Sequence, residues 1–140
     1  MVNEKSEIYE QHPDWILKEN GRKQYTERNN YVLDLTNPSV QNFVYQSVQK
    51  VITQNPYISY IKWDCNSPIN NPYAPYLSAT AQQQLWVKYI QGFYKVCDSL
   101  IKSYPNITFQ VCASGGGRID YGSLPYFHEF WTSDNTDALQ

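Results

Sequence analysis

Hydrophobic residues recur along this chain at two spacings, one typical of β-strands and the other typical of α-helices. Short β-branched and aromatic runs predict strands at 31–35, 58–64, 107–111 and 130–132. Apolar residues at helical spacing predict two helices between these strands. The first begins with Asn37 as its N-cap and Pro38 at its first position, and Thr80 caps the second. Strands that alternate with helices are typical of parallel βα units, which predicts an α/β fold.

The second helix is expected to pack one apolar stripe against the core, and Pro105 with Asn106 ends it. The stripe contains Trp86, Tyr89, Ile90, Phe93, Cys97, Leu100 and Ile101. A cofactor-binding face is the alternative interpretation, but core packing is the commoner use of this spacing. The three cysteines, Cys65, Cys97 and Cys112, are odd in number and lack metal-ligand spacing, so we interpret all of them as thiols.

The composition is that of a folded domain and is compatible with a carbohydrate site. The chain has 140 residues, enough for one domain with a core, and 16% of them are aromatic. Tyr and Trp rings pack on sugar faces while their polar atoms stay hydrated. The net charge is −2 with acids and bases intermixed, so the sequence has no basic patch for nucleic acid. No apolar run approaches membrane-spanning length, and no signal peptide opens the chain, which favours a cytoplasmic location.

Polar side chains follow the predicted strands at the point where each strand ends. Lys62, Asp64 and Asn66 alternate at the end of the second strand, so they project to the same side. A cation and an amide are therefore placed where they could hold a carboxylate in its ionised form. A purely structural Lys–Asp pair at a strand end is the alternative interpretation of this stretch taken alone.

Two further strand ends carry candidate chemistry. A triplet of glycines from Gly115 follows Cys112; it matches no dinucleotide or phosphate motif, and it would allow a sharp turn or a close approach to a ligand. Asp134 and Asp137 follow the last predicted strand. Strand ends on one face are where α/β barrels and open α/β sheets bind ligands. Two carboxylates on different strand ends are what glycoside hydrolysis requires.

Five segments, in order along the chain, together resemble the α-galactosidases of glycoside hydrolase family 36. They are HPDW (12–15), YVLDL (31–35), KWDCN (62–66), CASGGGRID (112–120) and WTSDNTDA (131–138). The resemblance covers essentially the whole chain. It implies a (β/α)8 TIM barrel of which residues 1–140 are the central portion, incomplete in this chain. On this resemblance, the family's N-terminal β-domain, its first and last barrel strands and its C-terminal β-domain are expected to be absent from this chain.

The resemblance implies retaining hydrolysis of terminal α-D-galactosyl residues in sugars such as melibiose or raffinose. Asp64 matches the nucleophile and Asp134 the general acid/base. The matched substrate-binding positions are Lys62, Asn66, Cys112, Gly115, Trp15 and Arg28. No metal or organic cofactor is implied. The implied partner is the α-galactoside substrate, with neither nucleic acid nor membrane, and the full-length form is expected to be a homo-oligomer.

The residue chemistry agrees with these roles. Lys62 beside Asp64 would favour the ionised nucleophile. Phe130 and Trp131 would desolvate Asp134, as a proton donor requires. Asp137 is the alternative acid, but it is expected to begin the next helix, where a helix N-terminus favours the anion.

Two other functions stay open at this stage. A galactosyltransferase of the raffinose-synthase type would share the nucleophile and differ in what accepts the galactose. A non-catalytic truncated remnant is the other alternative, because an open run of parallel strands leaves edges and faces bare. We therefore expect the isolated chain to be inactive and prone to aggregate or oligomerise.

Overall fold

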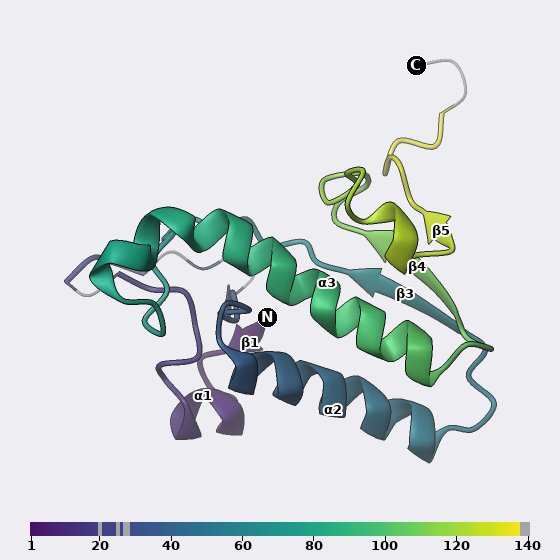
Figure 1. Ribbon diagram of the computed structural model, residues 1–140, viewed down its shortest axis with the longest axis horizontal. Coiled ribbons are helices and arrows are strands. Elements are labelled where there is room, and N and C mark those ends of the chain that lie inside the picture. Colours follow the sequence, from purple (N-terminus) through teal and green to yellow (C-terminus); the bar gives the residue numbers. More distant parts are fainter. Residues whose placement is uncertain (20, 25, 27–28, 138–140) are drawn as a thin grey trace.

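A computed structural model describes residues 1–19, 21–24, 26 and 29–137 of the chain (Figure 1). The strands are β1 (Val2–Asn3), β2 (Asn30–Tyr31), β3 (Tyr60–Asp64), β4 (Thr108–Cys112) and β5 (Glu129–Phe130). The α-helices are α1 (Glu7–Gln11), α2 (Pro38–Gln54) and α3 (Leu85–Ser103), and two 3₁₀ helices span Ala79–Gln84 and Leu124–Tyr126. The chain is thus an α/β protein, as predicted.

Three of the predicted strands form one parallel sheet in the order β3–β4–β5. The register pairs Asp64 with Cys112 across β3 and β4, and Val111 with Phe130 across β4 and β5. All three strands therefore end at the same edge of the sheet, which confirms the βα reading of this part. Within the described residues the sheet is open and does not close into a barrel.

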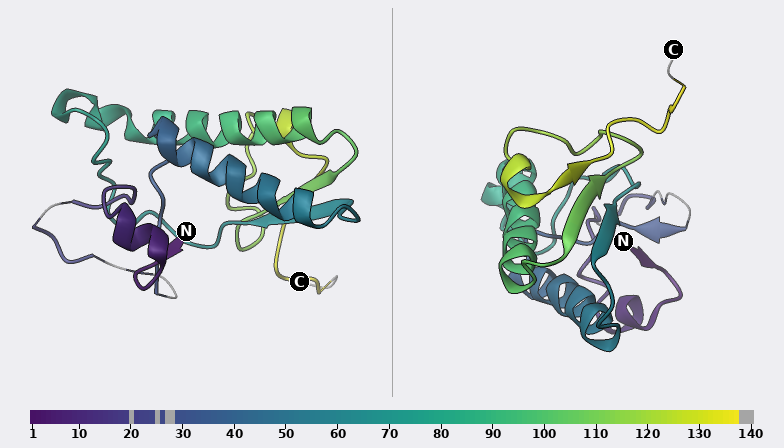
Figure 2. Two further views of the ribbon diagram at one scale, coloured as in Figure 1. Left: turned by 90° about the horizontal axis from the view of Figure 1, so that it is seen from below. Right: turned by 90° about the vertical axis from the view of Figure 1, so that its right-hand side faces the viewer.

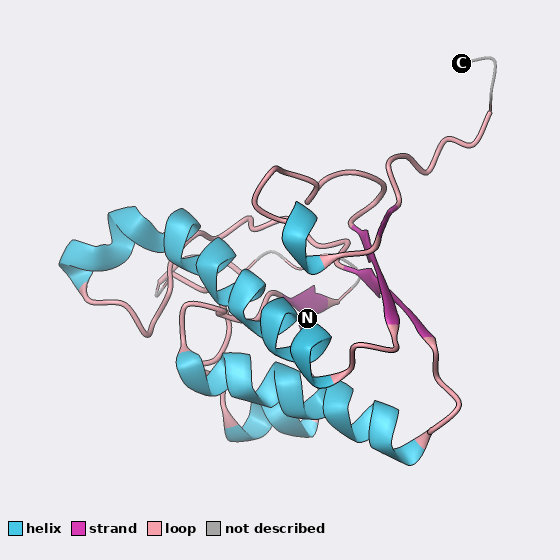
Figure 3. Ribbon diagram, turned by 45° about the vertical axis from the view of Figure 1, so that its right-hand side comes forward, coloured by secondary structure: helices cyan, strands magenta, loops and turns pink. Residues whose placement is uncertain are grey.

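Helices α2 and α3 lie on one face of this sheet, and no helix of the described residues covers the other face (Figure 2, Figure 3). Helix α3 runs beside α2, and its buried stripe meets the apolar side of β3 and β4. The Phe93 ring lies edge-on to Trp63 at 6.3 Å between centroids. On β3 the alternate residues Tyr60, Lys62 and Asp64 are exposed. The polar positions of β3 thus lie on the uncovered side, as strand alternation requires.

The start of α2 agrees with its prediction, whereas the start of α3 does not. The Asn37 side chain accepts a hydrogen bond from the Ser39 backbone N–H, and Pro38 begins the helix. Thr80 does not cap α3: it lies inside the 3₁₀ helix, and its hydroxyl bonds the Ser78 hydroxyl at 3.2 Å instead of a backbone N–H. The long helix begins only after this tighter turn has ended.

The predicted apolar stripe of α3 is confirmed except at its first residue. Tyr89, Phe93, Cys97 and Leu100 are buried, whereas Trp86 is 54% exposed. At the start of α3 the neighbouring Leu85 is buried instead, at 1% exposed, so Trp86 lies on the other side of the helix. Cys97 is a buried free thiol whose pKa is raised by burial, in keeping with a core residue.

The predicted strand at 31–35 is wrong in its length and its partner. Only Asn30–Tyr31 is a strand, and it pairs antiparallel with β1 and not with the parallel sheet. The backbone that follows is bonded by residues 15–17: Leu17 N–H donates to Val32 O, and Asp34 N–H donates to Trp15 O at 2.7 Å. A neighbouring segment of the chain thus occupies the backbone groups that a parallel partner would have needed.

Candidate active site

The site lies where β3, β4 and β5 end. Asp64 is the last residue of β3, Cys112 the last of β4, and Asp134 follows β5 by four residues. Parallel strands bring these three ends to one edge, so Asp64 and Asp134 come from the same end of the sheet as predicted. The strand between them contributes the glycine-rich turn.

Asn66 holds the carboxylate of Asp64 in place. Its side-chain N–H donates to Asp64 Oδ2 at 2.8 Å, and its Oδ1 accepts from the Ser114 backbone N–H at 2.7 Å. One amide therefore joins the end of β3 to the turn after β4. Ser114 adopts a positive φ of 49°, an uncommon conformation for a residue other than glycine. The turn is held in this form while its N–H points at Asn66.

Gly115 brings the same turn against the segment that carries Asp134. It has a φ of +83°, and a Cβ placed on it would lie 2.9 Å from Ser133 Cα and 3.2 Å from Asp134 N. The close approach predicted for this glycine is therefore found, but in this structure its neighbour is the backbone of residues 133–134. Only glycine satisfies both the conformation and the contact.

Lys62 and Asp134 meet at Trp131. Lys62 Nζ lies 4.1 Å from the centroid of the Trp131 ring, and the Trp131 indole N–H donates to Asp134 Oδ1 at 2.9 Å. Among the described residues the ion pairs join Arg22 with Glu19 and Lys102 with Asp98, so the expected pair of Lys62 with Asp64 is not formed. The ammonium group of Lys62 lies over the Trp131 ring, and the carboxylate of Asp64 is hydrogen-bonded by Asn66.

The expected desolvation of Asp134 is not found in this structure. Asp134 is exposed, and Trp131 touches it through a polar N–H. The bulky residues before Asp134 lie at the end of β5 beside β4, where the Trp131 backbone N–H donates to Val111 O, and they do not cover the carboxyl group. Trp131 therefore acts on Asp134 by a hydrogen bond instead of by burial.

Three other predicted site residues are placed differently from one another. Cys112 is the register partner of Asp64 but is only 2% exposed, so its thiol is covered. Trp15 is half-buried; it stacks on His12 at 3.9 Å between ring centroids and tilts against Phe43. No contact between Trp15 and the catalytic strand ends occurs in the described part of the chain. Arg28 lies outside the described residues.

Arg118 is a positioning residue that the sequence reasoning missed. Its guanidinium donates to the carbonyl oxygens of Cys65, at 3.4 Å, and Ser67, at 3.3 Å. It thus fixes the loop that directly follows β3. Its charge also faces Tyr89, whose pKa is raised to about 12 by burial, and there Arg118 acts in the lowering direction. The cation directly after three glycines was the signal available in the sequence.

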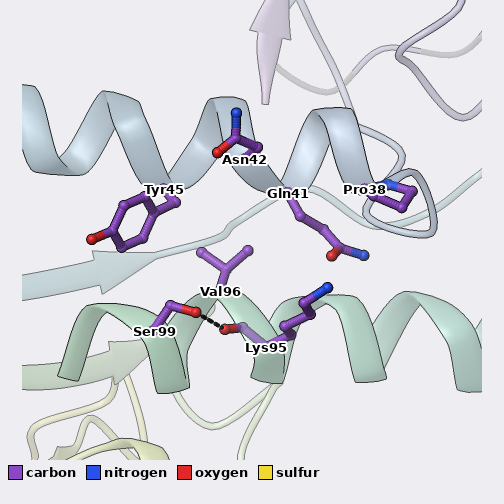
Figure 4. Close-up of a pocket in the computed structure, with 7 residues that line it drawn as sticks. All are labelled: Pro38, Gln41, Asn42, Tyr45, Lys95, Val96 and Ser99. Atoms are coloured by element: carbon purple, nitrogen blue, oxygen red, sulfur yellow. Dashed lines mark hydrogen bonds between the residues drawn. The ribbon is translucent and has the colours of Figure 1, made fainter. Parts of the chain in front are cut away.

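Two hollows lie at different places in the fold. One of about 350 Å³ adjoins the site and is lined by Asn66, Ser114, Arg118 and Trp86, among others. The other, of about 380 Å³, lies between α2 and α3 (Figure 4). It is lined by Pro38, Gln41, Asn42, Tyr45, Lys95, Val96 and Ser99. Neither lining contains a carboxylate, but the first includes Asn66, which is hydrogen-bonded to Asp64.

The described residues form neither a metal centre nor a membrane-spanning helix. No three His, Cys, Asp or Glu side chains among them gather closely enough to hold a metal ion. None of the helices in that same part of the chain is long and apolar enough to cross a membrane.

An α/β protein with two aspartates and an amide at the carboxyl edge of a parallel sheet has the arrangement of a glycoside hydrolase. Comparison with known proteins places it more closely. The family described as Melibiase matches residues 1–140, and the chain belongs to this family, glycoside hydrolase family 36.

Individual relatives agree with this assignment. The chain is 44% identical over 140 residues to a probable alpha-galactosidase C of Aspergillus terreus, covering all of the chain and 18% of that protein. It is 37% identical over 139 residues to the alpha-galactosidase AgaA of Geobacillus stearothermophilus, covering 99% of the chain and 19% of AgaA. Less than a fifth of either relative's length is therefore matched.

The solved structures show the same fold in this segment. The alpha-galactosidase of Lactobacillus brevis is 36% identical and superposes with a TM-score of 0.93 over 99% of the chain and 18% of that protein. The crystal structure of AgaA superposes with a TM-score of 0.92 over 99% of the chain and 19% of AgaA. AgaA variants have been solved in complex with raffinose and with stachyose.

Proposed function

We propose that this chain supplies the catalytic centre of a retaining α-galactosidase, as the central portion of a (β/α)8 barrel. Asp64 is the nucleophile and Asp134 the general acid/base. The observation that carries the proposal is the arrangement of Asp64, held by Asn66, and Asp134, held by Trp131, at one edge of a parallel sheet. Membership of the melibiase family and the sugar complexes of AgaA support the substrate class.

The reaction proceeds by two displacements at the anomeric carbon. Asp64 attacks that carbon while Asp134 protonates the departing glycosidic oxygen, which leaves a β-galactosyl ester on Asp64. Asp134, now ionised, takes a proton from water, and the hydroxide displaces Asp64 to give α-galactose. The amide of Asn66 keeps one nucleophile oxygen in place, so the other is directed at the sugar.

The test uses a graft in which this chain replaces the matching segment of AgaA, alongside the isolated 140-residue chain. We expect the graft to hydrolyse 4-nitrophenyl α-galactoside and raffinose, and the isolated chain to be inactive. Asp64→Ala should abolish turnover. A graft that folds and binds galactose but hydrolyses neither substrate would overturn the proposal. Galactose appearing on added sucrose, in place of free galactose, would assign the transferase instead.

Azide distinguishes the two carboxylates by product stereochemistry. With Asp64→Ala, azide takes the nucleophile's place and should give β-galactosyl azide. With Asp134→Ala, azide attacks the galactosyl ester without needing a general base and should give α-galactosyl azide. Asp137→Ala is the matched control and should give neither product. An α-azide from Asp137→Ala, with none from Asp134→Ala, would reverse the acid/base assignment.

A further inference from the structure

Trp131 touches both of the charged groups that flank the proposed reaction centre. Its ring face lies under Lys62 Nζ at 4.1 Å, and its indole N–H donates to Asp134 Oδ1 at 2.9 Å. It follows β5 directly, and its own backbone N–H donates to Val111 O at 3.0 Å, so the sheet fixes its position. The two contacts use different parts of one rigid side chain.

The hydrogen-bonding chemistry of the indole determines which carboxyl oxygen of Asp134 carries the proton. An indole N–H donates a hydrogen bond and has no lone pair in the ring plane with which to accept one. Asp134 Oδ1 must therefore be the oxygen without a proton when the bond is made. The proton delivered to the leaving group is then carried on Oδ2, and fixing Oδ1 fixes the direction in which Oδ2 points.

The ammonium group of Lys62 strengthens this arrangement. A cation over the face of an indole is attracted by the ring quadrupole and draws electron density toward that face. The N–H at the ring edge becomes a better donor as a result, in the way that linked polar groups polarise one another. Lys62 thus acts on Asp134 through the ring, although it makes no ion pair with Asp64 in the described structure.

We propose that Trp131 is a positioning residue that aims the acid/base Asp134 and couples it to Lys62. This inference rests on the proposed function, because it assigns a part in that reaction. It separates into two testable contacts. Trp131→Phe keeps an aromatic face for Lys62 and removes only the N–H, whereas Trp131→Leu removes both.

The contacts are measured first in the folded graft, by a signal that does not depend on activity. In the graft labelled with ¹⁵N at its indole nitrogens, the signal that Trp131→Phe removes is the Trp131 signal. Asp134→Asn and Lys62→Met should each shift that signal. The matched controls are Asp98→Asn and Lys102→Met, which break a salt bridge on α3 and should leave it in place. If the chemical shift of the Trp131 indole is unchanged in both Asp134→Asn and Lys62→Met, the inference is overturned.

The catalytic consequence is measured in the graft with a good and a poor leaving group. Aiming the proton matters only when the leaving group needs it, so Trp131→Phe should lower kcat/KM for raffinose about tenfold more than for 4-nitrophenyl α-galactoside. Trp131→Leu should lower both further. Equal losses on the two substrates in Trp131→Phe would show a merely structural role and overturn the inference. An inactive unsubstituted graft would count against the proposed function, and the indole measurement would still decide the inference.

Discussion

Removing the side-chain amide of Asn66 should weaken catalysis without unfolding the sheet. In Asn66→Ala the carboxylate of Asp64 loses the donor at 2.8 Å, and the Ser114 N–H loses its acceptor at 2.7 Å. A hydrogen bond to a charged group contributes about 1.5–3 kcal/mol. Ser114 is exposed, so water replaces the second bond and adds less than about 1 kcal/mol.

These values translate into a loss of about 10- to 150-fold in kcat/KM, since each 1.4 kcal/mol is roughly a factor of ten. The assay is the hydrolysis of 4-nitrophenyl α-galactoside by the graft, with far-UV circular dichroism to confirm folding. Asn66→Asp should be worse than Asn66→Ala, because it places a second carboxylate beside Asp64. Asn70→Ala is the control, an exposed asparagine of the same loop. A loss below about threefold in Asn66→Ala, or an equal loss in Asn70→Ala, would refute the reasoning.

Three further predictions concern packing, backbone conformation and pH. Gly92→Ala should destabilise the chain by about 2 kcal/mol in urea melts, because its Cβ would lie 1.9 Å from Leu35 O and outweigh the better helix propensity of alanine; a neutral result would contradict this packing. Gly115→Ala should lower kcat/KM of the graft more than about tenfold, and Gly21→Ala, which shares a positive φ but meets open space, should not. Burial raises the pKa of Asp34 above 3.8, against the hydrogen bonds it accepts. Its contribution to stability is therefore fully present below the unfolded pKa and declines as pH rises through the folded value, and Asp34→Asn should flatten that decline in melts from about pH 4 to 8.

The sequence predicted the elements whose signals are local. The cap at Asn37 and the apolar stripe around Phe93 depend on neighbouring residues, and both are found. The prediction of a parallel strand at 31–35 was wrong because β-branched residues fit any extended pairing, and here the stretch pairs with the segment around Ile16. The prediction that Thr80 caps the helix was wrong because a hydroxyl near a helix start can bond other groups, here the Ser78 hydroxyl.

The sequence predicted that the candidate residues share one edge of the sheet, but it did not predict the contacts between them. Motif resemblance named Asp64, Asn66 and Asp134, and strand topology explains why they share an edge. Side-chain partners across strands depend on register and rotamer, which no spacing in the sequence states. For this reason Lys62 was expected beside Asp64 and is found over Trp131 instead.

Because β4 lies between β3 and β5, the strands that carry Asp64 and Asp134 are farther apart than the carboxyl groups of a retaining enzyme. Neighbouring strands lie about 4.8 Å apart, so β3 and β5 are separated by about 9.6 Å, whereas a retaining mechanism needs carboxyl groups about 5–5.5 Å apart. The proposed retaining mechanism therefore requires Asp64 and Asp134 to lean toward each other above the end of the middle strand. The residues there are small, from Cys112 through Gly115. A single bulky side chain at this point would wedge the two carboxyl groups apart and favour the wider spacing at which a water molecule, and not a carboxylate, attacks the sugar.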